Sequence, residues 1–433
     1  FIRVESLYKV QSVCYRWKKI GSNPSLHAPF ETVCFYTRDN FRETTLGIGI
    51  NIFHTGTNKF KEISTPFDFV SYEAFHHHNV KHSVWNQYMR YWFPLYINKE
   101  HATKRSIAML KPSVEQIYPI LSRYQKKRLN WTYKLLDLLC KLMSSMVVQM
   151  MKQDIHASLK ALDGYCSFHR WLIYLVQQYP NVRQHVNTRV KQFISDSNCR
   201  SKINFPNLGE FIAMVTVSDF TWHDIKKAFI EESLHRNALW IYLKYPYLKN
   251  SRLYIRENSA KLKERAELSF NTKSVSSTLI MFHCYFLKHI GHMYDNMDDI
   301  AQYYDAHFGR ASHQMQTNLQ KEIFSIMKTK SYLEFFNYVE YQDEEYGALN
   351  SLVHVGLLLR NAMKRSIEKS YIRKNHYKSN RQHDIIYSIN YISAKTRWNN
   401  HKRKNSVSKY KRNNSTQQQN KNVSNQNMFD VLK

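Results

Sequence analysis

Cys166 and His169 are the residues whose types and spacing come closest to a reactive pair. They stand three positions apart in the segment GYCSFHRWL, and a helix there places the thiol and the imidazole on one face. Such a pair acts as a nucleophile when the imidazole stabilises a thiolate, or supplies two ligands to a zinc site. The apolar and aromatic neighbours favour a third interpretation, a thiol packed in the core. In that case His169 and Arg170 either cap buried backbone groups or pair with Asp163.

A run of histidines forms a second candidate site. His76, His77 and His78 are consecutive, and His82 follows closely. Imidazole is a common metal ligand, so His76 and His78 are the metal-site candidates in this run. Consecutive side chains point in different directions, however, and no cysteine or carboxylate stands at a metal-ligand spacing. We therefore favour a polar helix end or loop, and we predict neither a metal nor another cofactor.

Two further patterns have simpler explanations. Glu231 and Glu232 are adjacent acids, but neighbouring residues of a helix do not face each other. Glu232 and Arg236 stand four positions apart and fit an ordinary ion pair on one helix face. Gly47 and Gly49 lack the third glycine and the following helix that a phosphate-binding loop requires. No catalytic residue is predicted from these patterns.

The elements that position these residues are predicted to be mainly helices. Residues 131–180 contain two apolar-periodic segments joined by a short polar break, which predicts two helices packed as an antiparallel pair. Only 10 Gly and 9 Pro in 433 residues favour long uninterrupted helices. The apolar positions are Leu135, Leu138, Leu139, Leu142, Met143, Met146, Val147 and Met150 in the first segment, and Ile155, Leu159, Leu162, Phe168, Leu172 and Leu175 in the second.

The N-terminal part has a different pattern. Within residues 31–64, segments rich in β-branched and aromatic residues surround HTGTNK, which predicts a small antiparallel unit with a hairpin near Gly56. From Pro66 onward the patterns are helical, and Pro112 and Pro119 predict a short helix with breaks. About ten antiparallel helices are expected, without a strict sequence repeat. The predicted fold class is therefore mainly α, as an irregular α-solenoid or a multi-helix bundle.

Three regions follow from these patterns. Residues 1–65 form the small β-containing region, residues 66–372 the helical domain, and residues 373–433 a basic, low-complexity tail that we expect to be disordered. The chain begins at Phe1 and has no methionine before Met89, so we expect a fragment that lacks its N-terminal part. The β-containing region would then be the end of a truncated domain.

The positive charge is concentrated towards the C-terminus. The formal net charge of the whole chain is +29. From Arg360 onward, eighteen Lys and Arg residues stand against Glu368, Asp384 and Asp430, so eighteen minus three gives a net of +15 for this end. A basic tail of this kind binds anions, nucleic acid among them. The basic residues that we select as the anion-binding candidates are Lys402, Arg403, Lys404, Lys409, Lys411 and Arg412.

The cysteine pattern and the hydropathy indicate in which cellular compartment the protein is expected. The six cysteines are scattered without a C-x-x-C pair, which favours reduced thiols in the cytoplasm or the nucleus. No segment reaches the length of a membrane span, because the most apolar one, residues 279–287, contains His283 and ends against Lys288. No secretory signal is visible.

Several segments in a fixed order resemble a block found in large eukaryotic multidomain proteins. The segments are LGIGI, PFDFVSYEAF, FPLYINKEH, HASLKALDGYCSFHRWLIYLVQQYP, NFPNLGEFIAMVTVSD, RNALWIYLKYPYL and LIMFHCYFLKHI. The resemblance covers roughly residues 44–372, and in those proteins the block occurs beside ubiquitin-conjugating-type and RING-type domains. It carries no established activity that can be transferred to individual residues.

The parts that transfer ubiquitin are not evident in the sequence. A ubiquitin-conjugating core needs a His-Pro-Asn turn before its cysteine, and no such triplet occurs. Six scattered cysteines do not supply the paired ligands of a RING. The resemblance therefore implies a non-catalytic helical scaffold that binds a protein partner in the ubiquitin pathway. If the parent protein is an enzyme, ubiquitin transfer is the expected activity. The alternative is a protein that binds nucleic acid through its basic tail.

Overall fold

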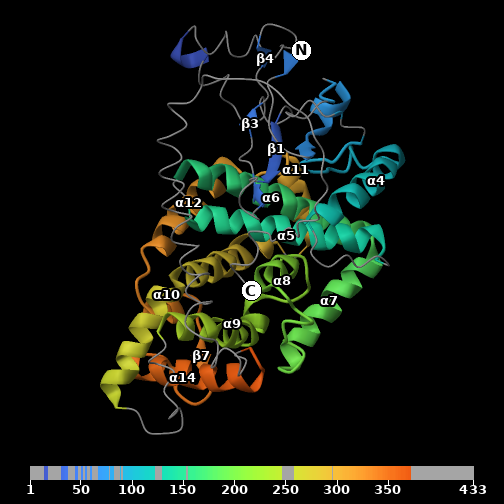
Figure 1. The fold of residues 1–433 in the computed structure, drawn as a ribbon. Helices are drawn as coiled ribbons and strands as arrows, with labels where there is room; N and C mark the ends of the chain where they lie inside the picture. Colours follow the sequence, from blue (N-terminus) through green and yellow to red (C-terminus); the bar gives the residue numbers. More distant parts are fainter. Residues whose placement is uncertain are drawn as a thin grey trace, which may run out of the picture.

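The computed structural model confirms that the chain is mainly helical (Figure 1). It describes residues 14–17, 31–37, 44–46, 50–51, 54–55, 59–60, 67–77, 79–81, 88, 91–121, 129–152, 155–245, 258–294 and 296–371. The predicted tail, with its basic candidates from Lys402 to Arg412, lies outside the described residues. None of the helices in the described part of the chain has the length and apolar character needed to cross a membrane.

A small antiparallel sheet lies at the N-terminal end. Strand β1 (Glu31–Thr37) pairs with β2 (Thr44–Leu46) and β3 (Ile50–Asn51), and on its other side with β6 (Phe67–Val70). The register places Cys34 opposite Asp68. A polypeptide rich in β-branched and aromatic residues suits this pairing, because such side chains fit a pleated surface.

The hairpin near Gly56 is confirmed, whereas the start of the helical region is not where the sequence placed it. Strands β4 (His54–Thr55) and β5 (Lys59–Phe60) pair on either side of the predicted turn. Residues after Pro66 were expected to be helical, but they form strand β6, so the sheet crosses the predicted boundary between residues 65 and 66. The alternation in FDFV is too short to separate a strand from a helix by periodicity alone.

The segment with two prolines also differs from the prediction. Helix α4 (Lys104–Leu121) runs without interruption through Pro112 and Pro119, although each proline removes one backbone donor. The helix is held by its buried face, which includes Leu110 and Val114. It packs against α5 (Trp131–Lys152), and this tertiary contact overrides the local preference for a break.

Helix α5 and helix α6 (Ile155–Gln178) form the predicted antiparallel pair. Polar N-caps begin most of the later helices, because Asn and Ser side chains accept hydrogen bonds from free N–H groups at a helix start. The later elements are α7 (Pro180–Ser195), α8 (Leu208–Val215), α9 (Trp222–Lys244), α10 (Ser259–Phe286), the π-helix η4 (Leu287–Gly291), α11 (Met297–Asp305), α12 (His313–Met327), α13 (Tyr332–Tyr338), β7 (Gln342–Asp343), β8 (Gly347–Ala348) and α14 (Leu352–Glu368).

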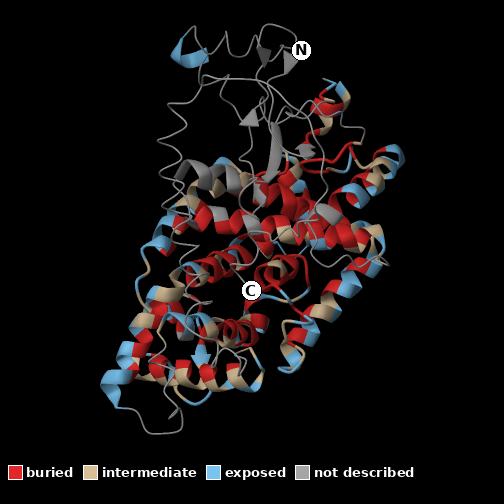
Figure 2. Ribbon diagram, in the orientation of Figure 1, coloured by how far each residue is buried: buried red, intermediate tan, exposed pale blue. Residues whose placement is uncertain are grey.

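The helices lie in roughly parallel layers. In Figure 1, α5 and α6 lie above α10 and α8, followed by α9 and then α14. The main hydrophobic core extends through these layers, from Val70 in β6 to Ala362 in α14, and the buried residues in Figure 2 follow the same path. A small separate cluster joins Ala238 of α9 and Met363 of α14. Helix α14 approaches α10 closely, because a Cβ atom on Gly356 would lie 2.7 Å from the backbone carbonyl carbon of Leu262.

Helix α10 bends part-way along its length. Lys273 has non-helical backbone angles of φ −126° and ψ 20°. The Thr272 hydroxyl just before it donates to the carbonyl of Leu268 at 2.8 Å, a type of side-chain bond that bends helices. The first part of α10 thus packs on α14, while its last part enters the core beside α5 and α9.

Candidate functional site

Cys166 and His169 lie in the middle of α6, and both are fully buried. They are joined through a third residue rather than directly. The Tyr304 hydroxyl, on α11, lies 3.0 Å from Nδ1 of His169 and also makes a hydrogen bond with the Cys166 thiol. His169 Nε2 lies 3.3 Å from the carbonyl oxygen of Thr216, so both ring nitrogens have partners.

Both groups of this core cluster are electrically neutral. Burial, followed by the negative charge of Asp163, raises the pKa of the Cys166 thiol to about 12. Burial also lowers the pKa of the His169 imidazole to about 3. A reactive cysteine needs a thiolate and a route for its substrate, and neither condition is met here. The cluster of Cys166, His169 and Tyr304 is therefore part of the packed core and joins α6 to α11.

Two nearby residues have partners other than those considered from the sequence. Arg170 forms a two-pronged ion pair with Asp305 of α11, with distances of 2.7 and 3.0 Å. Asp163, the partner considered for it, instead accepts a hydrogen bond from Gln316 of α12 at 2.6 Å. Both contacts join residues far apart in the sequence, and the local spacing gave no signal for them.

The histidine run begins in a π-helix, η2 (Glu73–His77), a rare type of turn often found at functional sites. His76 packs against the ring of Tyr72, with the ring centroids 4.3 Å apart. Burial is the largest cause that lowers the pKa of His76 to about 4. His101 stacks on the same Tyr72 ring at 4.4 Å, so the ring separates the two imidazoles. His78 and His82 lie outside the described residues.

Several buried polar atoms around η2 have no hydrogen-bond partner. They are Glu73 Oε2, His76 Nε2, His101 Nδ1 and Tyr96 Oη. His101 Nε2 does pair with Glu73 at 3.2 Å. Across the described part of the chain, no group of three or more potential ligands is arranged to hold a metal ion.

Glu232 of α9 is the centre of a buried charged cluster. Its carboxylate accepts hydrogen bonds from Arg236 at 2.7 Å, Lys369 at 2.8 Å and Tyr371 at 2.6 Å, and its side chain has no exposed surface. Burial alone would raise the pKa of Glu232, but the neighbouring His235, the charge of Arg236 and the other two donors outweigh burial and lower it to about 2. The predicted pair with Arg236 is confirmed, and the partners that follow α14 were not predicted.

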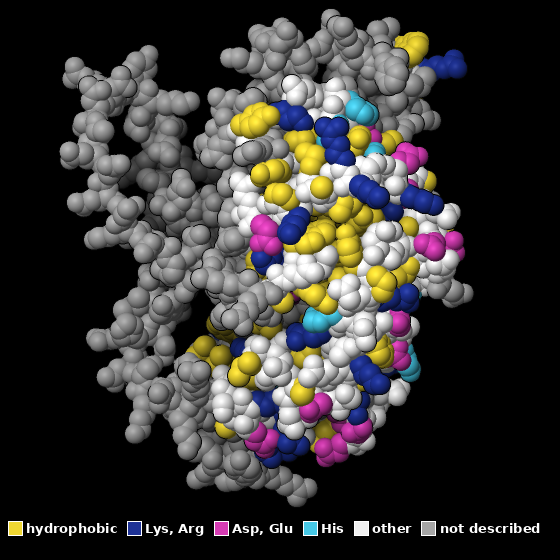
Figure 3. All heavy atoms as spheres, turned by 90° about the vertical axis from the view of Figure 1, so that its right-hand side faces the viewer, with side chains coloured by type: hydrophobic (Ala, Val, Ile, Leu, Met, Phe, Trp, Pro, Cys, Tyr) yellow, Lys and Arg dark blue, Asp and Glu magenta, His cyan; other side chains and the backbone are white. Residues whose placement is uncertain are grey.

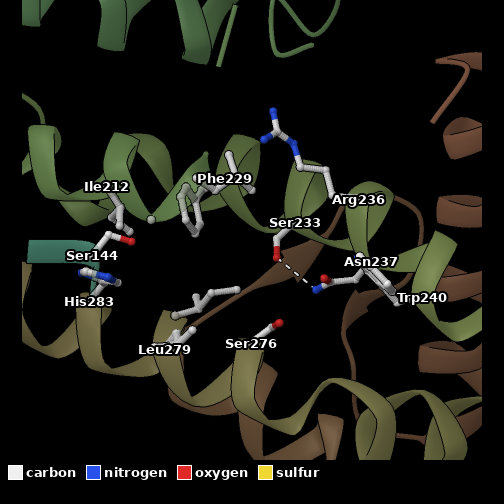
Figure 4. A pocket seen from close by; sticks show the side chains of 13 residues that line it. Ser144, Ile212, Phe229, Ser233, Arg236, Asn237, Trp240, Ser276, Leu279 and His283 are labelled. Carbon is white, nitrogen blue, oxygen red and sulfur yellow. Dashed lines mark hydrogen bonds between the residues drawn. The ribbon is translucent and has the colours of Figure 1, made fainter. Parts of the chain in front are cut away.

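A cleft between α9 and α10 is the best-formed concave site. Figure 4 shows Ser144 and His283 at one end, Ser233 and Ser276 in the middle, and Asn237 beside Trp240 at the other end. The cavity has a volume of about 40 Å³, enough for a small number of water molecules.

The cleft has a mainly apolar lining with a few hydroxyl and amide groups, and it lacks the groups expected of a catalytic site. Asn237 donates to the Ser233 hydroxyl at 3.4 Å. Burial lowers the pKa of His283 to about 3, so the imidazole is neutral. None of the residues that line the cleft is a carboxylate or a cysteine. Hydroxyl and amide groups of this kind position a ligand by hydrogen bonds without activating it.

A second, shallower groove runs along α7. It is lined by Arg183, Lys191, Asp219 and Phe220, among others, and has a volume of about 440 Å³. Arg183 pairs with Asp219 at 2.8 Å, and both side chains are about half exposed (52% and 51%).

Comparisons with known proteins leave the family open. No model of a known protein family matches the chain, and neither a curated protein nor a solved structure matches it.

Proposed function

We propose that the helical body is a non-catalytic scaffold that binds a protein partner, within a protein of the ubiquitin pathway. The observation that carries the proposal is the state of Cys166 and His169. The pair that came closest to chemistry in the sequence is buried and neutral. The pathway itself rests on the sequence resemblance, and the cytoplasm or the nucleus is the corresponding compartment.

The continuous core supports a single multi-helix body rather than a solenoid. In a solenoid each repeat contacts only its neighbours in sequence. Here α10 packs against α5, α9, α12, α13 and α14, which span most of the described helical residues. Such a body presents a rigid surface, as a scaffold requires.

The groove along α7 is the surface that we assign to the partner. Figure 3 shows the face of the molecule that carries α4 and α7, with hydrophobic side chains along its middle and lysines and arginines around them. Arg183 and Lys191 give the groove a net positive lining beside Asp219. A folded protein with an acidic patch is the complementary partner.

The absence of catalysis is tested by a thioester assay. The purified chain is incubated with ubiquitin, its activating enzyme and ATP, with and without a conjugating enzyme. We expect no reductant-sensitive ubiquitin adduct on this chain. An adduct that disappears in Cys166→Ser would overturn the proposal.

Partner binding is tested with conjugating enzymes loaded with ubiquitin, measured by calorimetry. We expect saturable binding that is weakened by the double variant Arg183→Glu/Lys191→Glu. The matched control is Arg365→Glu, an exposed arginine on α14 in an ordinary pair with Glu368. Equal loss in the control, or no binding to any loaded conjugating enzyme, would contradict a role in this pathway.

Nucleic-acid binding through the tail is the second candidate, favoured by the net charge of +15 from Arg360 onward. Binding of a DNA oligonucleotide should weaken steeply as salt rises, with a log–log slope set by the number of phosphates neutralised. Replacing Lys402, Arg403 and Lys404 by Gln should reduce that slope by about 2–3. An unchanged slope would show that the tail is not the binding element.

A further inference from the structure

Helix α12 has one side that faces away from the core. The buried residues of this helix are Leu319, Ile323 and Ile326. Phe324 and Met327, by contrast, are 43% and 47% exposed. In Figure 1, α12 lies on the left side of the helical body, whereas α4 and α7 lie on the right. The exposed apolar side chains of α12 are therefore remote from the groove that we assign to a protein partner.

Two lysines accompany these apolar side chains. Lys321 and Lys328 are exposed, and they stand three positions before and four positions after Phe324. Residues three or four positions apart lie on the same side of a helix, so the lysines flank the phenyl ring. Lys321, Phe324, Met327 and Lys328 together form what we call the α12 face.

Acidic groups do not neutralise the α12 face. Glu322 is the one acidic residue of α12, and its carboxylate accepts a hydrogen bond from the Tyr338 hydroxyl of α13. It stands two positions before Phe324, which places it on the other side of the helix. In the turn after α12, Glu334 accepts a hydrogen bond from the backbone of Lys330 at 2.9 Å, so the charges of these two residues offset each other. The α12 face itself carries two positive charges.

The size of the α12 face favours a membrane over a protein as its partner. A stable protein interface buries about 800 Å² on each partner and uses about 20–30 residues a side, far more than this face supplies. Neither of the two concave sites described above includes a residue of α12. A bilayer surface needs no matching shape, because the lipid headgroups rearrange around apolar side chains that enter among them.

We propose that the α12 face binds the surface of a membrane that contains anionic lipids. Phe324 and Met327 enter the headgroup region, and Lys321 and Lys328 contact the lipid phosphates. The unbranched side chain of methionine adapts well to such an irregular environment. The occupant is complementary in charge, since the two lysines meet an anionic surface.

The basic C-terminal end supplies a second attraction to the same surface. Its net charge is +15 from Arg360 onward, and a cluster of lysines and arginines is attracted to anionic lipids. A single weak membrane signal gives marginal, reversible binding, whereas stable binding takes two. The α12 face and the basic end therefore act together, and the face adds the apolar contact that a purely electrostatic tail lacks.

The test measures sedimentation of the full chain with phosphatidylcholine vesicles that contain about 30% phosphatidylserine, at physiological salt. We expect Lys321→Gln/Lys328→Gln to weaken binding about 25-fold, at about fivefold for each lysine. Phe324→Ser/Met327→Ser should weaken it by about tenfold or more, since less apolar surface leaves water. Circular dichroism should give the thermal midpoint of the wild type for both variants, because these side chains are exposed.

Two controls separate the α12 face from general attraction of a basic protein. Lys261→Gln/Lys263→Gln removes two exposed lysines near the start of α10 and thus the same charge from another place. It should weaken binding by less than about twofold, because charges far from the membrane are screened. Vesicles of phosphatidylcholine alone should bind the wild-type chain weakly, since they lack the anionic lipid.

The depth of insertion distinguishes the α12 face from the basic tail. Phe324→Trp should show additional fluorescence quenching by vesicles with brominated lipid chains, compared with the wild type. Asn318→Trp, at an exposed position of α12 outside this face, should show little additional quenching.

Three results would overturn the proposal. The first is a Lys321→Gln/Lys328→Gln variant that binds no more weakly than the α10 control. The second is the absence of additional quenching in Phe324→Trp, together with a loss of binding only when Lys402, Arg403 and Lys404 are replaced. The third is unchanged vesicle binding in the α12 variants with weakened binding of a loaded conjugating enzyme, which would reassign the face to a protein.

Discussion

The clusters around His169 and Glu232 bury polar groups to the same extent but in opposite electrical states. His169 and its partner Cys166 are neutral, with hydrogen bonds to Tyr304 and Thr216. Glu232 is charged and has donors that are themselves cationic or strongly polar. Burial thus keeps the His169 cluster neutral, whereas the buried charge of Glu232 is compensated by opposite charge.

The difference predicts how each cluster responds to change. A buried imidazole that is neutral becomes costly when it takes up a proton. A buried carboxylate becomes costly when any of its hydrogen-bond donors is removed. The Glu232 cluster should therefore show the largest effects of single substitutions, and the His169 cluster the clearest response to mild acid.

Arg236→Met should produce the largest loss of stability. It leaves the Glu232 carboxylate buried without its main cation, at a cost of about 3–5 kcal/mol in the free energy of unfolding. Urea unfolding measures the change, and Arg183→Met, in an exposed pair, should cost less than about 1 kcal/mol. The double variant Glu232→Gln/Arg236→Met should recover part of the loss. A small effect of Arg236→Met would mean that the carboxylate is not effectively buried.

Leu139→Ala tests the core that both clusters adjoin. Leu139 of α5 is completely buried, so the substitution should cost about 2–5 kcal/mol through lost burial and the cavity it leaves. Denaturant unfolding should show this as a lower midpoint with an unchanged slope. A cost below about 1 kcal/mol would mean that this face of the helix is available to a partner.

Gly356→Ala tests the contact between α14 and α10 in the part of the molecule that contains Glu232. The new methyl group would meet the backbone of Leu262, which has little room to move, so we expect a loss of about 1–3 kcal/mol. At Gly291 of η4 the nearest atoms lie at an ordinary 3.6 Å. Gly291→Ala should therefore change thermal stability by less than about 0.5 kcal/mol, and an equal loss at both positions would remove the explanation.

The most gradual effect is expected in the pH dependence of the free energy of unfolding. His169 has a folded-state pKa of about 3 against an ordinary 6.5, so its contribution is complete above pH 6.5 and is lost as the pH falls towards 3. For Glu232, with about 2 against 4.5, the loss occurs between pH 4.5 and 2. Between pH 6 and 5, His169→Gln should flatten the decline in unfolding free energy by up to about 1.4 kcal/mol per pH unit. Glu232→Gln should leave that slope unchanged. His283 and His76 have lowered pKa values too and contribute with the same sign.

The sequence was sufficient to predict those elements whose determining contacts are local. The apolar spacing of residues 131–180 predicted the pair α5 and α6, and the turn residues near Gly56 predicted a hairpin. It was insufficient where a distant partner decides the outcome. Helix α4 continues through Pro112 because α5 supports it, a contact that no local rule contains.

The candidate sites divide in the same way. The i,i+4 spacing predicted the pair of Glu232 and Arg236 and gave no sign of Lys369, which lies 137 positions away. Arg170 and Asp305 meet only because α11 packs against α6, a contact that the spacing of the residues does not contain.

The hydrogen bonds from Lys369 and Tyr371 to Glu232 also decide how the molecule responds to mechanical force. Both donors directly follow α14, at the C-terminal limit of the described residues. Within the described residues, these bonds are the first side-chain contacts that a force applied beyond Tyr371 would load. Their rupture would leave a buried carboxylate with fewer donors, so extraction should begin at α14 and continue into α10, against which it packs. A single buried carboxylate thus ties the last described residues of the chain to α9.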